Sequence, residues 1–235
     1  MTVQRSVKEH ATRPRLVGVI ASPADLHRAT RLRRPPDLFE LRLDALPSLG
    51  ATAQRLIAQL ARPLIITARH PREGGRNNLS TAQRRELLLR WLPRAAFVDV
   101  ELRAGAQLRD VLEAAAEQDT PRIISVHDLR RTPPLRDMER LLFRAEKLSP
   151  DIFKLVTRTD RPADVARLLE FFHSHHRRLP MCVMGLGRLG REARRELGRR
   201  GSLLHYVHLG TEVVPGQFSL SAARQLNRDD QTYIH

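Results

Sequence analysis

A regular alternation of short apolar runs and helix-like segments constrains the fold of this chain most strongly. The apolar runs cover residues 16–22, 38–44, 64–69, 96–102, 122–128, 151–157, 181–187 and 204–210. Helix-like segments separate them at about 23–33, 48–61, 80–93, 104–118, 134–148, 161–176 and 190–200, and Ser219–Leu226 closes the series. Eight strands that alternate with eight helices predict an α/β fold built as a (β/α)8 TIM barrel. A doubly wound open sheet is the alternative.

No linker or change in composition divides the 235 residues. We therefore expect one catalytic barrel domain over residues 15–235, preceded by a polar, basic stretch over residues 1–14 that forms a tail or a lid over one barrel end. The single cysteine, Cys182, lies inside an apolar run, so no disulfide framework is expected. With no signal-peptide core and no apolar run of membrane-spanning length, the sequence predicts a cytoplasmic protein without membrane partners.

The net charge of +15 raises the question of nucleic-acid binding. The arginines are spread over nearly every expected helix, and only 4% of the residues are aromatic. This distribution favours a solvated basic surface, because single-stranded nucleic acid is usually bound by aromatic side chains that stack on the bases. We expect no nucleic-acid partner, although a non-catalytic basic barrel that binds nucleic acid remains an alternative.

One lysine stands out in this arginine-rich chain. The sequence holds 41 basic residues, of which three are lysines, and Lys154 lies in the middle of the apolar run 151–157. Arginine does not lose its proton in proteins, whereas a desolvated lysine can become a neutral, nucleophilic amine. Such an amine can form a Schiff base with a carbonyl substrate. The alternative is a lysine near a strand end whose amine reaches water.

Ionisable residues alternate with apolar ones along the expected strands. Glu40, Arg42 and Asp44 share one parity of the second run, so they point into the barrel if the apolar residues face the helices. The same reasoning places further groups from the next four strands inside, namely Arg69, Asp99, Glu101, His127 and Lys154. Buried charges of both signs predict a polar, ligand-sized site, with a purely structural ion network as the alternative.

Possible partners of Lys154 follow from this arrangement. His127 is a candidate general base, and Glu73 is placed to orient it or to raise its pKa. A clamp for an anionic substrate is expected from Arg42, Arg69 and Arg194, and Gln217, in a tight Pro-Gly-Gln loop, is a candidate for binding substrate hydroxyls.

Two other motifs suggest ligands that we do not expect. Residues 185–190 fit the GxGxxG pattern, but the acidic residue with the required spacing, Glu212, follows the last strand and lies in a loop. The histidines at 173, 175 and 176 resemble metal ligands but are expected in a solvated connection at the opposite barrel end. We therefore expect no cofactor and no metal.

Taken together, the motifs between Leu16 and Leu226 resemble those of type I 3-dehydroquinate dehydratases, the Schiff-base-forming enzymes of the shikimate pathway. The matching segments are Glu40-Leu-Arg42-Leu-Asp44, Thr67-Ala-Arg69 with Glu73-Gly74-Gly75, Val98-Asp-Val-Glu101-Leu102, Ser125-Val-His127-Asp128 with Thr132-Pro133, Phe153-Lys154, Gly187-Arg-Leu-Gly190-Arg191 with Arg194, and Pro215-Gly216-Gln217. Each segment is weak alone, but their order and spacing make a specific signal.

The resemblance implies a hydro-lyase that converts 3-dehydroquinate into 3-dehydroshikimate. It implies that Lys154 forms an imine with the C3 ketone, that His127 acts as general acid and base, and that Glu73 holds His127 in position. It assigns substrate binding to a further set of residues: Glu40, Arg42, Arg69, Arg194 and Gln217. It also implies a homodimer, lid-like loops near Glu73 and before Gln217, and no cofactor.

One position departs from the family pattern. The family usually has a serine two positions before Pro-Gly-Gln, where this chain has Val213. Loss of one neutral hydrogen bond would cost about 1–1.5 kcal/mol of substrate binding. The family also has a serine near the end of the first strand, and Ser22 is the residue of this chain that lies there. Another Schiff-base barrel lyase or aldolase is the closest alternative function.

Overall fold

The computed structural model describes residues 14–46, 48–212 and 214–232. Its main strands are β1 (Arg15–Ile20), β2 (Leu38–Arg42), β3 (Leu64–Thr67), β4 (Phe97–Glu101), β5 (Arg122–Asp128), β6 (Ile152–Arg158), β7 (Met181–Leu186) and β8 (Leu204–His208). They are parallel and follow the order β7-β6-β5-β4-β3-β2-β1-β8, and a two-residue strand, β9 (Phe218–Ser219), pairs with β8.

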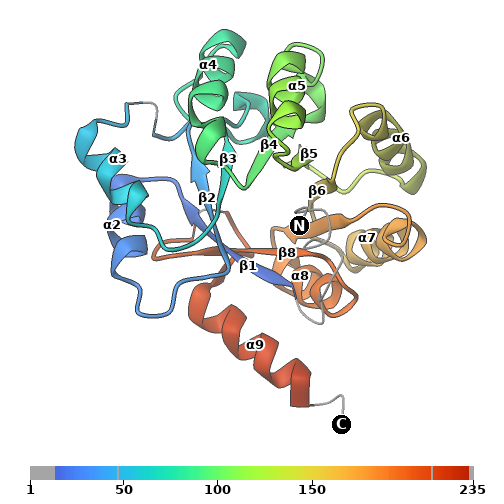
Figure 1. Cartoon of the computed structure of the whole chain (residues 1–235). Helices are drawn as coiled ribbons and strands as arrows, with labels where there is room; N and C mark the ends of the chain where they lie inside the picture. Colours follow the sequence, from blue (N-terminus) through green and yellow to red (C-terminus); the bar gives the residue numbers. More distant parts are fainter. Residues whose placement is uncertain (1–13, 47, 213, 233–235) are drawn as a thin grey trace.

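Helices surround this curled sheet (Figure 1). The α-helices are α2 (Pro23–Arg31), α3 (Ala51–Ala58), α4 (Thr81–Trp91), α5 (Arg109–Glu117), α6 (Leu135–Glu146), α7 (Pro162–His175), α8 (Gly190–Arg199) and α9 (Leu220–Thr232). Short 3-10 turns are η1 (Pro71–Glu73), η2 (Leu92–Arg94) and η3 (Leu102–Ala104). Within the described ranges, no helix is long and apolar enough to cross a membrane.

The two ends of the sheet, β7 and β8, lie side by side. Leu203 N donates a hydrogen bond to Met181 O at 2.9 Å, and Val183 N donates to Ser202 Oγ at 2.9 Å. Toward the carboxyl ends, β9 pairs with β8, and Gly187 N donates to Pro215 O at 2.9 Å. Eight strands therefore form a ring, and the (β/α)8 barrel predicted from the alternation is confirmed.

Two apolar layers follow from the alternation of side chains along the strands. Phe39, Leu41 and Leu43 belong to the large cluster between strands and helices, as the parity of the second run predicts. A second cluster fills the inside of the ring, with contributions such as Ile65 and Phe97. Because this inner cluster occupies much of the barrel, charged groups are brought together in the space that remains toward the carboxyl ends of the strands.

Helix ends explain most differences from the expected ranges. Ser80 and Gln83 form a reciprocal capping box at the start of α4, as their spacing suggests. The segment expected to be helical from residue 104 instead opens with the turn η3, and α5 begins only at Arg109. The last helix continues to Thr232, beyond the expected end at residue 226. Residues 1–13 of the expected tail lie outside the described residues.

Candidate active site

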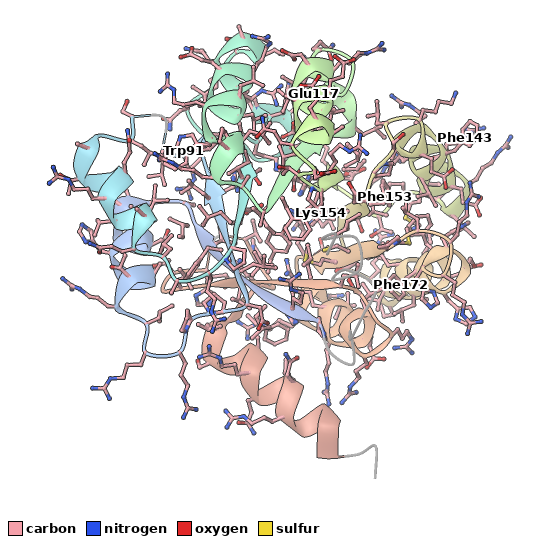
Figure 2. All side chains as sticks on the ribbon, viewed as in Figure 1. Trp91, Glu117, Phe143, Phe153, Lys154 and Phe172 are labelled. Carbon is pink, nitrogen blue, oxygen red and sulfur yellow. The ribbon has the colours of Figure 1, made fainter. Side chains whose placement is uncertain are left out.

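A cavity of about 160 Å³, here called the barrel cavity, collects the candidate residues. Its lining includes all eight residues singled out in the sequence, which are Glu40, Arg42, Arg69, Glu73, His127, Lys154, Arg194 and Gln217. Figure 2 shows Lys154 inside the ring of strands, while the neighbouring Phe153 packs on Phe171 of α7. Alternation along β6 therefore places Lys154 in the barrel cavity and Phe153 in the core between strands and helices.

Lys154 is held among two carboxylates and an aromatic ring. Its Nζ lies 3.0 Å from Asp99 Oδ2 and 3.5 Å from Glu40 Oε1. The same atom lies 3.9 Å from the centroid of the Tyr206 ring, within the range of a cation–π contact. With 2% of its surface exposed, Lys154 does not extend to water, so the alternative of a solvent-reaching lysine is wrong.

Asp99 is neutralised mainly by Arg69. The two guanidinium nitrogens of Arg69 donate to the two carboxylate oxygens of Asp99 at 3.1 and 3.0 Å. Arg69 Nη1 also donates to Ser125 Oγ at 2.7 Å, and that hydroxyl donates to Asp99 at 2.6 Å. Burial opposes ionisation of Asp99, but Arg69 and Lys154 outweigh it and hold the pKa of Asp99 well below its usual range.

A second buried ion pair, between Arg84 of α4 and Glu101 of β4, lies next to the Arg69–Asp99 pair. Arg84 of α4 donates to Glu101 Oε2 at 2.9 Å, and His70 N donates to Glu101 Oε1 at 2.7 Å. Arg84 is 1% exposed, so the expectation that the arginines of the helices form a solvated surface is wrong for this residue. The pair fixes the segment that follows β3, on which Glu73 lies.

His127 and Glu73 form a dyad at the mouth of the barrel cavity. Ser125 pairs directly with Lys154 in the sheet, so His127 lies two residues nearer the carboxyl end on the same inward face. Glu73 Oε2 accepts from His127 N at 3.0 Å and lies 3.1 Å from His127 Nδ1. Glu73 thereby fixes the ring and directs the other imidazole nitrogen away from itself.

The local electrostatics suit a neutral imidazole. Burial, followed by the positive charges of Arg69 and Lys154, lowers the pKa of His127 well below 6.5. Burial raises the pKa of Glu73 from 4.5 to about 7. An unprotonated His127 at neutral pH can accept a proton, and Glu73 changes its charge in the same pH range in which enzymes usually work.

Asp44 organises the other side of the mouth. Its carboxylate accepts from Arg42 Nε at 2.9 Å and from Arg42 Nη2 at 2.8 Å. It also accepts from the backbone nitrogens of Arg69 and Arg76 at 3.0 and 2.9 Å. Burial acts against ionisation of Asp44, but these hydrogen bonds, above all those from Arg42, lower its pKa overall. Asp44 therefore joins β2 to the turn that carries Glu73.

Arg194 differs from the other two arginines of the expected clamp. Arg42 and Arg69 are paired with carboxylates, whereas the described partners of Arg194 are the carbonyls of Gly185 and Tyr206 and the sulfur of Met184. Burial lowers its pKa to about 10, so it stays charged at neutral pH. A buried cation whose described hydrogen-bond acceptors are all neutral is suited to bind an anionic ligand.

The Pro-Gly-Gln loop packs onto the start of α8. Glu212 Oε1 accepts from Gly216 N at 2.7 Å and from Gln217 N at 3.1 Å, which explains this acidic residue without a nucleotide. Gly216 has φ +90° and lies so close to Gly190 that a Cβ on either residue would contact the other backbone. The last glycine of the GxGxxG pattern, Gly190, therefore allows the Pro-Gly-Gln loop to pack closely against the start of α8. Val213 lies outside the described residues.

Two other sequence expectations can be placed. His173 and His175 lie in the last turn of α7 and His176 ends it, so they are not in a loop as expected. The described part of the chain holds no group of three or more histidine, cysteine or acidic residues suited to a metal. Ser22 caps α2 by accepting from Asp25 N, and it is not part of the barrel-cavity lining.

Tyr206 is a site residue that the sequence reasoning missed. It is 5% exposed, and its hydroxyl has no hydrogen-bond partner among the described residues. Burial, together with the nearby carboxylates Glu40 and Asp99, raises its pKa well above 10. The sequence does contain a signal for Tyr206. Side chains alternate between the inside and the outside of the barrel along each strand, and the same alternation that holds for β2–β6 places Tyr206 of β8 inside.

Comparisons with known proteins agree with this geometry. The sequence profile described as "Type I 3-dehydroquinase" matches residues 21–233. A 3-dehydroquinate dehydratase of Methanosarcina barkeri is 33% identical over 204 residues, covering 81% of this chain and 84% of the relative. A 3-dehydroquinate dehydratase of Methanocella arvoryzae is 32% identical, covering 87% of this chain and 91% of the relative.

The fold is shared with solved structures as well. The crystal structure of 3-dehydroquinate dehydratase from Geobacillus kaustophilus superposes with a TM-score of 0.84 at 24% identity, covering 95% of this chain and 93% of the other. Since the profile spans nearly the whole chain and the relatives match over most of their own length, this chain belongs to the type I 3-dehydroquinase family.

Proposed function

We propose that this chain is a hydro-lyase that dehydrates 3-dehydroquinate to 3-dehydroshikimate through a Schiff base on Lys154. Membership of the family supports the substrate and the overall reaction. The observation that carries the mechanism is the environment of Lys154, a lysine with 2% exposure beside two carboxylates and below the His127–Glu73 dyad. A lysine desolvated in this way is suited to covalent catalysis.

The first step is imine formation. The Lys154 amine adds to the C3 carbonyl, and the carbinolamine hydroxyl takes up one proton from solvent and leaves as water, which gives an iminium ion. The positive charge then resides on the nitrogen between Asp99 and Glu40, which lie 3.0 and 3.5 Å from Nζ. Two fixed carboxylates stabilise that charge more effectively than water would, because they need no reorientation during the reaction.

The second step removes the proton at C2. His127 accepts this proton, and the electron pair of the C–H bond neutralises the iminium to give an enamine. Its pKa, lowered by burial and neighbouring cations, keeps the ring ready to accept a proton at neutral pH. Glu73 stabilises the imidazolium that forms, through the contact of 3.1 Å with Nδ1.

The third step expels the C1 hydroxyl. The nitrogen lone pair of the enamine re-forms the iminium, the enamine double bond shifts to C1–C2, and the bond from C1 to its hydroxyl oxygen breaks. His127 gives its proton to this hydroxyl, which departs as water. Water then hydrolyses the conjugated iminium, which releases 3-dehydroshikimate, restores the Lys154 amine and returns to solvent the proton taken up in the first step. His127 thus acts first as base and then as acid, and the proton count closes over one cycle.

Substrate binding is assigned to the polar residues around the dyad. Arg194, which has no carboxylate among its described partners, is the main candidate for the substrate carboxylate. The hydroxyls are assigned to Glu40, Arg42 and Gln217, which line the same cavity. Arg69 lines the same cavity, and because its two terminal nitrogens donate to Asp99 and Ser125, it also positions those two groups.

The test compares turnover with imine trapping. With 3-dehydroquinate, the parent should produce the absorbance of the conjugated product, and borohydride should trap the substrate on the protein. His127→Ala should still trap the substrate while turnover falls by a factor of about 10² or more. Trapping lost together with retained turnover would contradict the assigned roles, and no turnover in the parent would contradict the proposed activity.

Two further proposals rest on the family likeness, namely that the chain forms a homodimer and that it works in the cytoplasm. Cys182, a single buried cysteine, is compatible with a reducing compartment. Sedimentation velocity would test the dimer, which is contradicted by one species of about 27 kDa at micromolar concentration.

A further inference from the structure

A second, larger hollow lies on the other side of the dyad. This hollow, here called the outer cavity, has a volume of about 720 Å³, compared with about 160 Å³ for the barrel cavity. It is bounded by η1, η3, β5, the segment after β5 and α6. In Figure 1, α6 stands apart from α5 on this side of the barrel. The two cavities share Glu73, His127 and Leu129 in their walls.

The outer cavity has an apolar floor. Leu102 and Leu155 are buried, and Val126 and Leu141 are partly exposed, all within the layer between strands and helices. A space of this size bounded by aliphatic side chains suits the ring or short chain of a small organic molecule. Covering such a floor removes apolar surface from water and stabilises the complex.

The rim of the outer cavity is strongly basic. Arginines come from four different segments, and they are Arg72, Arg103, Arg130 and Arg144. Among the described residues, the guanidinium groups of Arg72, Arg130 and Arg144 have no hydrogen bond or ion pair, and Arg103 approaches Glu73 Oε1 at 3.8 Å. Guanidinium groups in this state favour carboxylate ligands, which they bind with two parallel hydrogen bonds.

The acidic groups of the outer cavity are already engaged. Asp128 Oδ1 accepts from the backbone nitrogens of Arg130 and Arg131, each at 3.0 Å. Glu73 is bound to His127. The four arginines outnumber these two carboxyl groups, so the net charge of the outer cavity is positive, which disfavours a cation and also disfavours the same face of a second copy of this chain.

We propose that the outer cavity binds a small organic anion with a ring-sized apolar body, and that this ligand modulates the active site through the shared wall of Glu73 and His127. The binding site itself is independent of the proposed function. The modulation rests on the proposed function, because it presumes that Glu73 and His127 act in catalysis. Binding and the conformation of the dyad are thermodynamically linked. A ligand that binds more tightly when Glu73 and His127 are in their catalytic conformation therefore increases the population of that conformation.

Benzoate is a suitable probe, since it joins one carboxylate to one ring. Calorimetric titration of the full chain should show saturable benzoate binding, at least about tenfold tighter than acetate, which lacks the ring, and than benzyl alcohol, which lacks the charge. Equal affinity for all three probes, or no saturable binding of benzoate, would overturn the proposal.

Variants locate the probe. Arg144→Glu and Leu141→Asp should each weaken benzoate binding at least about tenfold, by charge reversal on the rim and by a charge in the floor. Arg136→Glu is the matched control, because it lies exposed on the same helix but outside the cavity lining. Arg194→Gln should leave benzoate binding unchanged; loss there with no loss in Arg144→Glu would place the anion in the barrel cavity and refute the proposal.

Steady-state kinetics test the modulation separately. Saturating benzoate should change kcat in the parent and leave kcat of Arg144→Glu unchanged. Purely competitive inhibition against 3-dehydroquinate, with the same inhibition constant in both proteins, would refute the outer site. If the parent shows no turnover but benzoate binding still depends on Arg144, the proposed function fails while the binding site stands.

Discussion

Glu73→Gln separates the proposed catalytic role of this carboxyl group from its cost to the stability of the folded protein. Burial raises the pKa of Glu73 from 4.5 to about 7, so the folded protein holds this proton more tightly than the unfolded chain does. Stability therefore falls as the pH rises from about 4.5 to about 7 and is constant above that range. The difference between these pKa values corresponds to about 3 kcal/mol of unfolding free energy.

Glutamine keeps the shape of Glu73 and removes the titration. We expect Glu73→Gln to be more stable than the parent at pH 8, and the difference between them to shrink by about 2.5 kcal/mol between pH 8 and pH 5. Activity should change in the opposite direction, with kcat lowered about tenfold or more, since a neutral amide stabilises the His127 imidazolium poorly. We also expect parental kcat to rise with pH as Glu73 loses its proton near pH 7, and this rise should be absent in Glu73→Gln.

Urea unfolding followed by circular dichroism at pH 5, 6, 7 and 8 measures the stability difference. Glu117→Gln, an exposed substitution on α5 that also removes one carboxylate, is the matched control (Figure 2). A variant that is less stable than the parent at pH 8, or a difference that does not vary with pH, would refute the reasoning. Unchanged kcat would refute the role of Glu73 in holding His127.

Two other substitutions test the surroundings of the dyad and of Lys154. Asp44→Asn should destabilise the protein by about 1–3 kcal/mol at pH 7 and raise KM, because Arg42 and the turn carrying Glu73 lose a common partner. Since the folded pKa of Asp44 is lowered, this difference should shrink as the pH falls below about 4, and a difference independent of pH in urea unfolding would contradict it. Tyr206→Leu should slow borohydride trapping, whereas Tyr206→Phe keeps the ring beneath Nζ and should trap like the parent. Equal trapping rates in Leu and Phe variants would exclude a role for the ring.

Local patterns were sufficient to predict the centre of the site. Lys154 is a lysine inside an apolar strand, and His127 ends the strand before it, so strand parity and the barrel rule bring them to the same end. The parity of the second strand predicted the inward position of Glu40 in the same way. Each of these inward positions follows from the parity of its own strand, and closure of the strands into a ring brings the side chains together across the barrel.

Partners from other layers could not be predicted in this way. Arg84 is one of 38 arginines, and nothing in its helix distinguishes it from exposed neighbours until Glu101 is seen beside it. Arg69 is predicted to clamp substrate, and its two terminal nitrogens also donate to Asp99 and Ser125, contacts that depend on side-chain geometry. Helix ends likewise depend on local turns such as η3, which replace the first helical turn expected before Arg109.

Borohydride reduction with 3-dehydroquinate, followed by peptide mass mapping, tests the central claim most directly. The chain offers an internal comparison, because its three lysines are Lys8, Lys147 and Lys154. We predict one stable adduct, on Lys154, and none in Lys154→Ala. An adduct on Lys147 or Lys8 instead, or turnover without any adduct, would contradict a Schiff-base mechanism at Lys154.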